Sequence, residues 1–429
     1  MSTPIRILLA TRPLVPPWDE ASKNFAYFLA KSIRDPNIEF HLLTSEEKLE
    51  GLGPNCIQHP IFRNGTFNFE AKARLAAFLG TKGRAFDIVH FLFTPTPLNS
   101  FLSNLLVGSQ PKTIQTIATL REERWNETDW KRMFFADKLV TYTEHSKKKL
   151  QSAGFESVEC IYPGIDLDRF SPQPKDPDVL KKLNISPDDF IVSYVGEYAR
   201  LGATDMIADM LVRYLRPSSP VQGEVSGQQT DRGVSRLSTP PSPLSPDVLT
   251  GRHLPSGKGD RMEKIIFLFA LRVKNDADRK KKEEIIEKFR EAGILDAIRF
   301  SDTVSDVASL YNIADIVTFP VADMHGKFDV PLVILEAYAC GRPVILSDLP
   351  IFEEFSNPQI SATIPRDNGE ALWSAIESLR IDSEQRKTLG RSARAFVERS
   401  FDLEETAGTY SELYQKNPRK SSFLSSIGS

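Results

Sequence analysis

Short runs of consecutive apolar residues recur along this chain, and a segment with helical spacing follows many of them. Residues 5–10 form the first run, and apolar residues spaced for one face of a helix begin near Ala21. A run that is apolar at nearly every position is typical of a strand buried on both faces of a parallel sheet. Strands that alternate with helices therefore predict an α/β fold built on a doubly wound parallel sheet.

This alternation occurs twice, so we expect two such domains that face each other across a cleft. The predicted strands lie at 5–10, 38–43, 87–93, 112–117 and 138–143, then at 190–195, 265–271, 298–300, 316–319 and 343–346. Prolines at 172, 174 and 177 interrupt regular structure between the two sets. We place an N-terminal domain at 1–172, a C-terminal domain at 173–400, a crossover helix at 401–415 and a flexible tail at 416–429.

One segment of the second domain has a different composition. Residues 216–260 contain seven Pro, eight Ser and six Gly, and they lack Phe, Tyr, Trp and Ile. Such a segment cannot bury enough apolar surface to offset the entropy lost on ordering. We expect a disordered insertion, whose simplest interpretation is a tolerated surface loop without a function of its own.

Charge and cysteine content exclude several classes of protein. The 54 basic residues nearly balance the 57 acidic ones, which leaves no basic excess for nucleic acid. No apolar run is long enough to span a membrane, and the start of the chain lacks a signal-peptide pattern. Cys56, Cys160 and Cys340 are too far apart for a disulfide framework, and neither they nor the six His suggest a metal site. We expect a cytoplasmic protein without cofactor or metal, with peripheral membrane contact left open.

The segment at 328–348 is the strongest candidate for a binding site. A loop rich in turn residues leads into a helix near Pro331, because proline suits the first helical turn. The backbone N–H groups of Leu332 and Val333 would then face the cleft, where a helix N-terminus favours phosphate. Glu336 lies one turn further along, either as an acceptor for a ligand hydroxyl or as an acid interacting with the helix dipole.

At this point the residues resemble a known family. The segment LVILEAYACGRPVILSD at 332–348 resembles the donor-site signature of retaining GT-B glycosyltransferases of family four, the glycosyl transferases group 1. Other segments resemble that family in the same order: DIVHF, ADKLVTYTEHSKKKLQSAG, IYPGIDLDRFSP, VGEYARLGATDMI and LYNIADIVTFP. Together they extend over nearly the whole chain apart from the insertion and the tail.

The resemblance implies transfer of a sugar from a nucleotide-diphosphate donor to an acceptor hydroxyl, with retention of configuration and without a metal. It places the donor on the second domain and the acceptor, which is a glycan, a lipid or a small molecule, on the first. By the same resemblance Glu336 binds the ribose hydroxyls. The other residues that it assigns to the donor are Gly196, Arg200, Pro331, Leu332 and Val333. Arg272 and Lys274 either add charge at this site or are solvated loop cations.

The chain departs from the family's pattern at several positions. Phe328 stands where the family has the first Glu of its Glu-x7-Glu pair, and Asp329 is a candidate substitute. Glu197 replaces a basic residue, Leu201 replaces a Lys, and Ala118 or Thr119 occupies the place of a His. These changes keep an alternative open, in which the protein is a catalytically weakened homologue that binds a nucleotide sugar or acts as a scaffold.

The loop after the first strand lacks the family's Gly-Gly pair. Ser22 is small enough for close approach of a ligand to the backbone, and Lys23 adds a donor. Asp19 and Glu20 are candidates for binding acceptor hydroxyls or acting as a base, although Asp19 is equally suited to cap a helix. Trp18 either stacks on the acceptor or packs in the core.

Four further features of the first domain have two interpretations each. Arg121 follows a strand and is placed to hold an acidic acceptor or the donor phosphates. His145 lies either at the cleft or in a structural position, and His90, inside an apolar strand, is the better candidate for a satisfied core residue. The segment at 130–135 is either a basic, aromatic lipid contact or a buried helix face.

Overall fold

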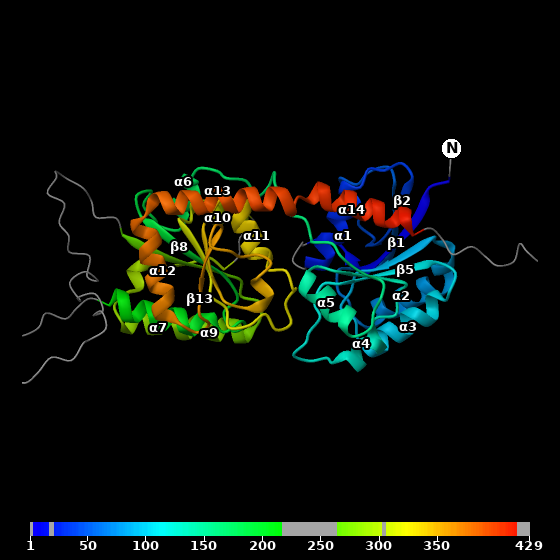
Figure 1. The fold of residues 1–429 in the computed structure, drawn as a ribbon, viewed down its shortest axis with the longest axis horizontal. Coiled ribbons are helices and arrows are strands. Elements are labelled where there is room, and N and C mark those ends of the chain that lie inside the picture. Colours follow the sequence, from blue (N-terminus) through cyan, green and yellow to red (C-terminus); the bar gives the residue numbers. More distant parts are fainter. Residues whose placement is uncertain (1–2, 17–20, 217–263, 303–305, 418–429) are drawn as a thin grey trace, which may run out of the picture.

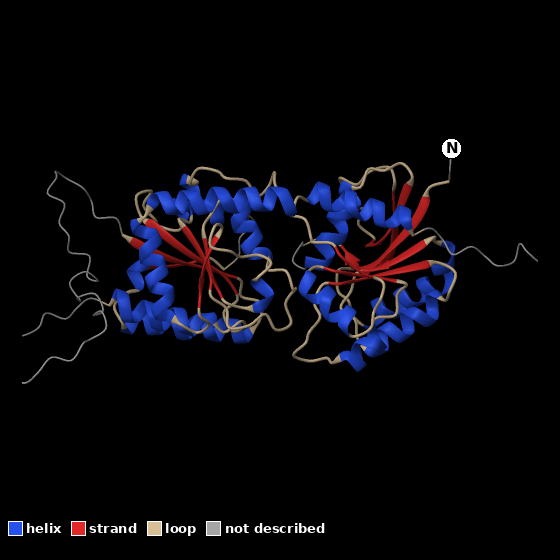
Figure 2. Cartoon of the chain, viewed as in Figure 1, coloured by secondary structure: helices blue, strands red, loops and turns tan. Residues whose placement is uncertain are grey.

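The computed structural model describes residues 3–16, 21–216, 264–302 and 306–417. Figure 1 shows two sheets beside each other along the long axis of the molecule, and Figure 2 shows that helices surround both of them. The predicted insertion, apart from Arg216, lies outside the described residues. So do Trp18, Asp19 and Glu20, and the tail from residue 418.

The first sheet has seven strands, and every neighbouring pair is parallel. Its order is β3-β2-β1-β4-β5-β6-β7, with these bounds: β1 Ile5–Leu14, β2 Ile38–Ser45, β3 Cys56–Phe62, β4 Ile88–Phe91, β5 Lys112–Ile117, β6 Lys138–Thr141 and β7 Val158–Cys160. The edge strands β3 and β7 were not predicted. Strand β3 is only partly buried and mixes polar with apolar residues, and β7 has three residues, so neither forms a continuous apolar run.

Helices α1 to α5 connect these strands: α1 Ala21–Ser32, α2 Phe69–Lys82, α3 Pro97–Val107, α4 Glu127–Met133 and α5 Glu144–Ser152. Helix α2 shows how a polar side chain sets the start of such a helix. Its start is set by Asn68, whose side chain accepts the N–H of Ala71 and so satisfies one of the unpaired amides of the first turn. Crossover connections of this kind are what a parallel sheet requires.

The second sheet has six parallel strands in the order β10-β9-β8-β11-β12-β13. Their bounds are β8 Phe190–Gly196, β9 Ile265–Leu271, β10 Ile298–Phe300, β11 Ile316–Phe319, β12 Val344–Ser347 and β13 Ser361–Ile364. The helices of this half are α6 Pro177–Lys182, α7 Ala203–Leu215, α9 Asp276–Glu291, α10 Val307–Ile313, α11 Leu332–Ala339, α12 Gly369–Ile381 and α13 Ser383–Ser400. The fold class is thus the predicted one, with two Rossmann-like parallel sheets.

The last helix, α14 (Leu403–Lys416), returns to the first sheet (Figure 1). The Tyr414 hydroxyl lies 2.8 Å from Nδ1 of His90, and the Tyr410 ring lies 5.5 Å from that of Phe25. Before this helix, the Ile165 N–H donates to the Phe401 carbonyl at 2.7 Å. The end of the chain therefore ties the second half to the first.

Gly164 makes this close approach possible. A Cβ at this position would collide with the backbone of Leu403, at the start of α14. The glycine in the segment IYPGIDLDRFSP thus has a packing reason. Within the described ranges, no helix is both long enough and apolar enough to cross a bilayer.

Candidate functional site

The carboxyl ends of strands from both sheets open onto a shared cavity of about 540 Å³. From the first half, Arg12 in β1, Thr94 after β4 and Arg121 after β5 line it. The second half contributes the ends of β8 and β11, the loop after β9, and the loop that leads into α11. Doubly wound sheets bind ligands at this edge, so the cavity is the candidate site.

Positive side chains surround this cavity. Among the described residues that line it, Glu197 is the one acid, and the cations are Arg12, Arg121, Arg200, Arg272, Lys274 and Lys327. Arginine presents a fork of N–H donors that matches phosphate oxygens, and lysine adds a point charge. The cavity is therefore suited to a ligand with several negative charges, such as a diphosphate.

Glu197 orders two of these cations. It is 6% exposed at the end of β8, and its carboxylate accepts hydrogen bonds from the ammonium groups of Lys274 and Lys327. Burial raises the pKa of Glu197, but the two lysines outweigh burial and hold that pKa below its ordinary value. Burial lowers the pKa of Lys327, and the carboxylate of Glu197 only partly raises it again. The acid that replaces the family's basic residue thus positions basic groups from two other loops.

Arg200 reaches the cavity over a glycine. Its Nη2 donates to the carbonyl of His325 at 3.0 Å. A Cβ at Gly326 would collide with this guanidinium, and the backbone of Gly326 has a φ of +66°, which a glycine adopts most readily. Gly326 therefore lets Arg200 lie on the cavity wall.

Helix α11 begins at the cavity, with Pro331 as its N-terminal cap residue. The Leu332 N–H donates to the Val330 carbonyl at 3.0 Å, so the prediction that this amide is free for a ligand is wrong. The tight turn formed by this bond uses the amide locally. Pro331, Leu332 and Val333 nevertheless all line the cavity, as expected from the helix start.

Glu336 lies beside this cavity rather than on its wall. It lines a neighbouring cavity of about 260 Å³, and Arg272, Phe328 and Leu332 line both. The Tyr311 hydroxyl donates to Glu336 at 2.8 Å. Burial raises the pKa of Glu336 to about 7, although the Tyr311 hydrogen bond and Arg169 oppose this shift. A carboxyl group held in this way is suited to hydrogen bonding with hydroxyl groups of a ligand.

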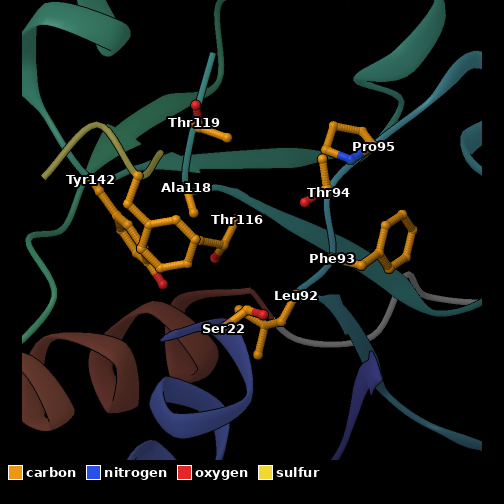
Figure 3. Close-up of a pocket in the computed structure, with 10 residues that line it drawn as sticks. Ser22, Leu92, Phe93, Thr94, Pro95, Thr116, Ala118, Thr119 and Tyr142 are labelled. Atoms are coloured by element: carbon orange, nitrogen blue, oxygen red, sulfur yellow. The ribbon is translucent and has the colours of Figure 1, made fainter. Parts of the chain in front are cut away.

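A small pocket of about 20 Å³ marks the point where the two halves meet (Figure 3). Phe328, in place of the family's Glu, packs against Tyr142 with ring centroids 5.9 Å apart. Figure 3 shows Tyr142 on one side of the pocket and Thr94 on the other, with Ser22 and Thr116 between them. Burial raises the pKa of Tyr142, so its phenol stays protonated at neutral pH. The pocket therefore combines aromatic faces with neutral hydroxyl groups.

Asp329 joins the two halves of the chain. Its carboxylate accepts the Ser146 hydroxyl at 2.6 Å and the Leu120 N–H at 3.1 Å, and its own N–H donates to the Ala118 carbonyl at 2.9 Å. Burial raises the pKa of Asp329 to about 7, and these hydrogen bonds oppose the shift. The expectation that Asp329 replaces the missing Glu as a sugar contact is therefore wrong, because its carboxylate faces the first half.

Glu354 makes a second link of the same kind. Its carboxylate accepts the N–H of Glu144 at 2.8 Å and that of His145 at 2.6 Å, which are the first two residues of α5. The Tyr162 hydroxyl also donates to it, at 2.9 Å. A carboxylate at the start of a helix interacts favourably with unpaired amides there.

Most of the donor-site residues predicted from the sequence lie together. Seven of the eight line the 540 Å³ cavity: Gly196, Arg200, Arg272, Lys274, Pro331, Leu332 and Val333. Glu336 adjoins it, as described above. On the acceptor side, Ser22 and Arg121 line the same cavity, and Ala118 and Thr119 line the small pocket next to it.

Other expectations for the first half require correction. Lys23 is buried and does not line the cavities described above. The His145 side chain pairs with Glu122 at 2.8 Å, and its backbone binds Glu354, so its position is structural. Trp130 and its neighbours Met133 and Phe134 are buried, which excludes the segment at 130–135 as a lipid contact.

His90 is a core residue, as favoured from the sequence. Its ring nitrogens lie 2.8 Å from the Tyr414 hydroxyl and 2.7 Å from the Thr116 hydroxyl. Burial lowers the pKa of His90 to about 3, so the ring is neutral at physiological pH.

Sequence reasoning missed Arg12, Lys327 and Tyr142. Arg12 lies two residues after the first apolar run, and Lys327 adjoins Phe328, so proximity to a predicted strand end and to the motif was the available signal. Tyr142 gave no such signal, because it reads as one more apolar residue of the strand at 138–143.

Comparison with known proteins identifies a family for part of the chain. Residues 274–382 match the family described as glycosyl transferases group 1. D-inositol 3-phosphate glycosyltransferase from Salinispora arenicola is 26% identical over 291 residues, which is 65% of this chain and 54% of that protein. The chain thus spans about half the length of the relatives it matches. The resemblance predicted from the sequence is confirmed for the matched segment.

Solved structures share the fold over nearly the whole chain. Anabaena HepE in complex with UDP-glucose is 14% identical, with a TM-score of 0.66 over 96% of this chain and 100% of that one. Sucrose-phosphate synthase from Thermosynechococcus elongatus is 16% identical, with a TM-score of 0.68 over 97% and 99%. At these identities the likeness establishes the fold, which is the predicted GT-B arrangement of two Rossmann-like domains.

Proposed function

We propose that this chain is a retaining glycosyltransferase, which moves a sugar from a nucleotide-diphosphate donor to an acceptor hydroxyl. The observation that carries this proposal is the cavity between the two sheets, which six cations and the start of α11 line. The match of residues 274–382 to the glycosyl transferases group 1 supports it, as do the relatives named D-inositol 3-phosphate glycosyltransferase. None of these similarities favours the alternative of a weakened binding or scaffold protein.

The donor in this proposal is a nucleotide-diphosphate sugar. Arg200, Lys274 and Lys327 would contact the diphosphate, because all three line the cavity and the charges of Arg200 and Lys274 act on Lys327. Glu336 would accept hydrogen bonds from the ribose hydroxyls in the adjoining cavity. HepE was solved with UDP and with UDP-glucose, so a uridine nucleotide is the first donor to test.

The chemistry follows from the charge of the cavity. The bond between the anomeric carbon and the diphosphate oxygen breaks, and the acceptor oxygen forms its bond to that carbon on the same face. The negative charge that develops on the departing diphosphate is stabilised by fixed cations, which need no reorganisation during the step. The acceptor's proton passes to an oxygen of the leaving diphosphate. In this mechanism the residues of the chain bind, orient and stabilise, and the step requires no covalent bond between the protein and the sugar.

Contacts between the halves would close the site around the donor. Asp329 and Glu354 each receive backbone N–H groups from the first half, and these bonds exist only when the halves are together. Closure excludes water from the cavity, which strengthens the interaction of the cations with the diphosphate and limits hydrolysis.

The acceptor would bind on the first half, where Ser22, Thr94 and Arg121 line the cavity. The acceptor in this proposal is a glycan, a lipid or a small molecule, and the protein makes peripheral contact with a membrane where the acceptor is a lipid. We place the protein in the cytoplasm, where nucleotide sugars would be available to it.

Thermal stabilisation by ligands tests the donor site directly. The purified protein is heated with UDP, GDP, ADP and their glucose conjugates, in the presence of a chelator. A ligand at one hundred times its dissociation constant stabilises the folded state by about 2.7 kcal/mol, which raises the midpoint by a few degrees. We expect this shift with one nucleotide and its sugar, followed by transfer to an acceptor. No shift with any of them would refute the donor site, and a shift without turnover on any acceptor would favour a binding protein.

A further inference from the structure

A second cavity of about 540 Å³ lies in the first half, between α2 and α3. It adjoins the donor cavity, because Arg12, Phe93, Thr94 and Arg121 line both of them. A ligand in this second cavity would therefore have one end beside the donor. Its volume lies within the range of about 300 to 1,000 Å³ that is usual for small-molecule sites.

The body of this cavity is apolar. Side chains from α2, α3 and the preceding loop line it: Phe67, Leu75, Leu79, Leu98, Leu102 and Leu106. We call this space the α2–α3 groove. Apolar walls of this extent favour hydrocarbon over a sugar, because burying apolar surface is the main source of binding energy there.

The apolar surface continues outward along α3. Leu98, Phe101 and Leu105 are 70%, 64% and 62% exposed, and their spacing places them on one face of the helix. Phe69, at the start of α2, is 86% exposed. Helix α3 also contains no charged residue. An exposed patch of this kind marks a site of interaction, and here it borders the groove, because Leu98 belongs to both.

The inner end of the groove is positively charged. The Arg12 guanidinium and the Lys72 ammonium lie 5.7 and 5.9 Å from the centre of the Phe67 ring. Arg121 has a φ of 52°, and its Nε is buried without a hydrogen-bond partner among the described residues. Buried donors are normally satisfied, and a strained backbone of this type is typical of functional positions. Arg121 therefore indicates an anionic group at the junction of the two cavities.

We propose that the α2–α3 groove binds the hydrocarbon chain of a lipid acceptor taken from a membrane surface. The chain would occupy the apolar groove, an anionic head group would contact Arg12 and Arg121, and a head-group hydroxyl would face the donor cavity. The acceptor role rests on the proposed function, whereas binding of the lipid does not. A protein partner or a second copy of this chain would cover the exposed face of α3, but it would leave the groove and the inner cations unoccupied.

Calorimetric titration with lysophosphatidylglycerols of increasing chain length, each below its micelle concentration, tests the proposal. These probes carry one chain, one phosphate and free hydroxyls. Affinity should rise about fourfold for each added methylene until the groove is filled. Glycerol phosphate alone should bind far more weakly, because it lacks the chain.

Two neighbouring positions of α2 provide a matched pair of variants. Ala76 lines the groove, whereas Ala77 is exposed on the same helix and does not. Ala76→Phe fills the groove and should weaken the long-chain probe on the order of tenfold or more, and Ala77→Phe should leave its affinity unchanged. Both variants should keep the thermal shift with nucleotide. If Ala76→Phe does not fold, Leu102→Gln, at a half-exposed groove position of α3, serves the same purpose.

The outcomes separate this inference from the proposed function. The lipid site would be refuted if the protein binds nucleotide but its affinity for the lipid probes does not depend on chain length. Equal effects of Ala76→Phe and Ala77→Phe on lipid affinity would refute it as well, and in both cases the donor site would stand. If the protein does not bind nucleotide but its lipid affinity clearly depends on chain length, the donor site would be refuted and the lipid site would stand. Binding to phosphatidylglycerol vesicles that Ala76→Phe leaves unchanged would also overturn the groove, because the exposed face of α3 would then act alone.

Discussion

Replacement of Asp329 by Asn should remove a pH dependence from the stability of this protein. The carboxyl group is 6% exposed, and it accepts hydrogen bonds from Ser146 and from the backbone of Leu120. Burial raises its pKa from 3.8 to about 7, and the hydrogen bonds oppose that change without reversing it. The folded protein therefore keeps a proton on Asp329 at pH values where the unfolded chain has lost it.

The pKa difference sets the size and the sign of the effect. A rise from 3.8 to about 7 corresponds to ~4 kcal/mol, at ~1.4 kcal/mol per pKa unit. Between these two values the folded state binds more protons than the unfolded state, so the free energy of unfolding falls as the pH rises. The Asn variant has no proton to lose, so it should gain up to ~4 kcal/mol relative to wild type between about pH 4 and pH 7.

Urea unfolding followed by intrinsic fluorescence, at a series of pH values, measures this difference. Burial also raises the pKa of Glu336 to about 7, but Glu336 is present in both proteins and its contribution cancels on subtraction. A difference that stays constant across the series would refute the reasoning. A difference that moves in favour of wild type would show that the hydrogen bonds outweigh burial.

Ser146→Ala provides an internal check on this balance. The Ser146 hydroxyl donates to the carboxylate at 2.6 Å and so favours its ionised form. Its removal should raise the pKa of Asp329 further and extend the fall in stability to higher pH. The same series of unfolding curves would detect it.

Three predictions concern the donor cavity. Lys327→Gln should weaken binding of the nucleotide diphosphate about tenfold by calorimetry, because one cation is lost; Lys281→Gln, which removes a surface pair with Asp205, should have no such effect. Glu197→Gln should make nucleotide binding weaken at a lower pH than in wild type, since Glu197 offsets the burial that lowers the pKa of Lys327; identical pH profiles would contradict this. Glu336→Ala should raise the Michaelis constant for the donor about tenfold with a smaller change in kcat, and an unchanged constant would remove Glu336 from the ribose site.

The parts of the fold that were predictable are those that burial alone determines. Strands β9 and β11 have the predicted bounds, because each is a run of mostly apolar residues in the interior of its sheet. In the edge strand β3, residues 57–60 are each polar or exposed, so no continuous apolar run marks this strand. Its sequence therefore resembles a loop, and only its pairing with β2 identifies it.

The donor cavity was predictable for a topological reason. In a parallel sheet the carboxyl ends of all strands lie at one edge. The residues that follow the neighbouring strands β9, β8 and β11 therefore lie close together at that edge. This argument locates Gly196, Arg272 and Lys274 without any knowledge of side-chain contacts. It cannot say which cations pair with an acid, and so the arrangement around Glu197 was missed.

Residues 327 to 329 show why a motif is insufficient for assigning function at this site. Lys327 binds Glu197 within the second half, Phe328 packs against Tyr142, and Asp329 binds Ser146, 183 residues earlier in the chain. Comparison with the family's motif shows only that Phe328 replaces a Glu. In the folded chain Lys327 lines the candidate cavity and Asp329 links the two halves, and neither contact involves the side chain at position 328. We therefore infer that Phe328 alters the contact with the transferred sugar, and that diphosphate binding and closure are retained.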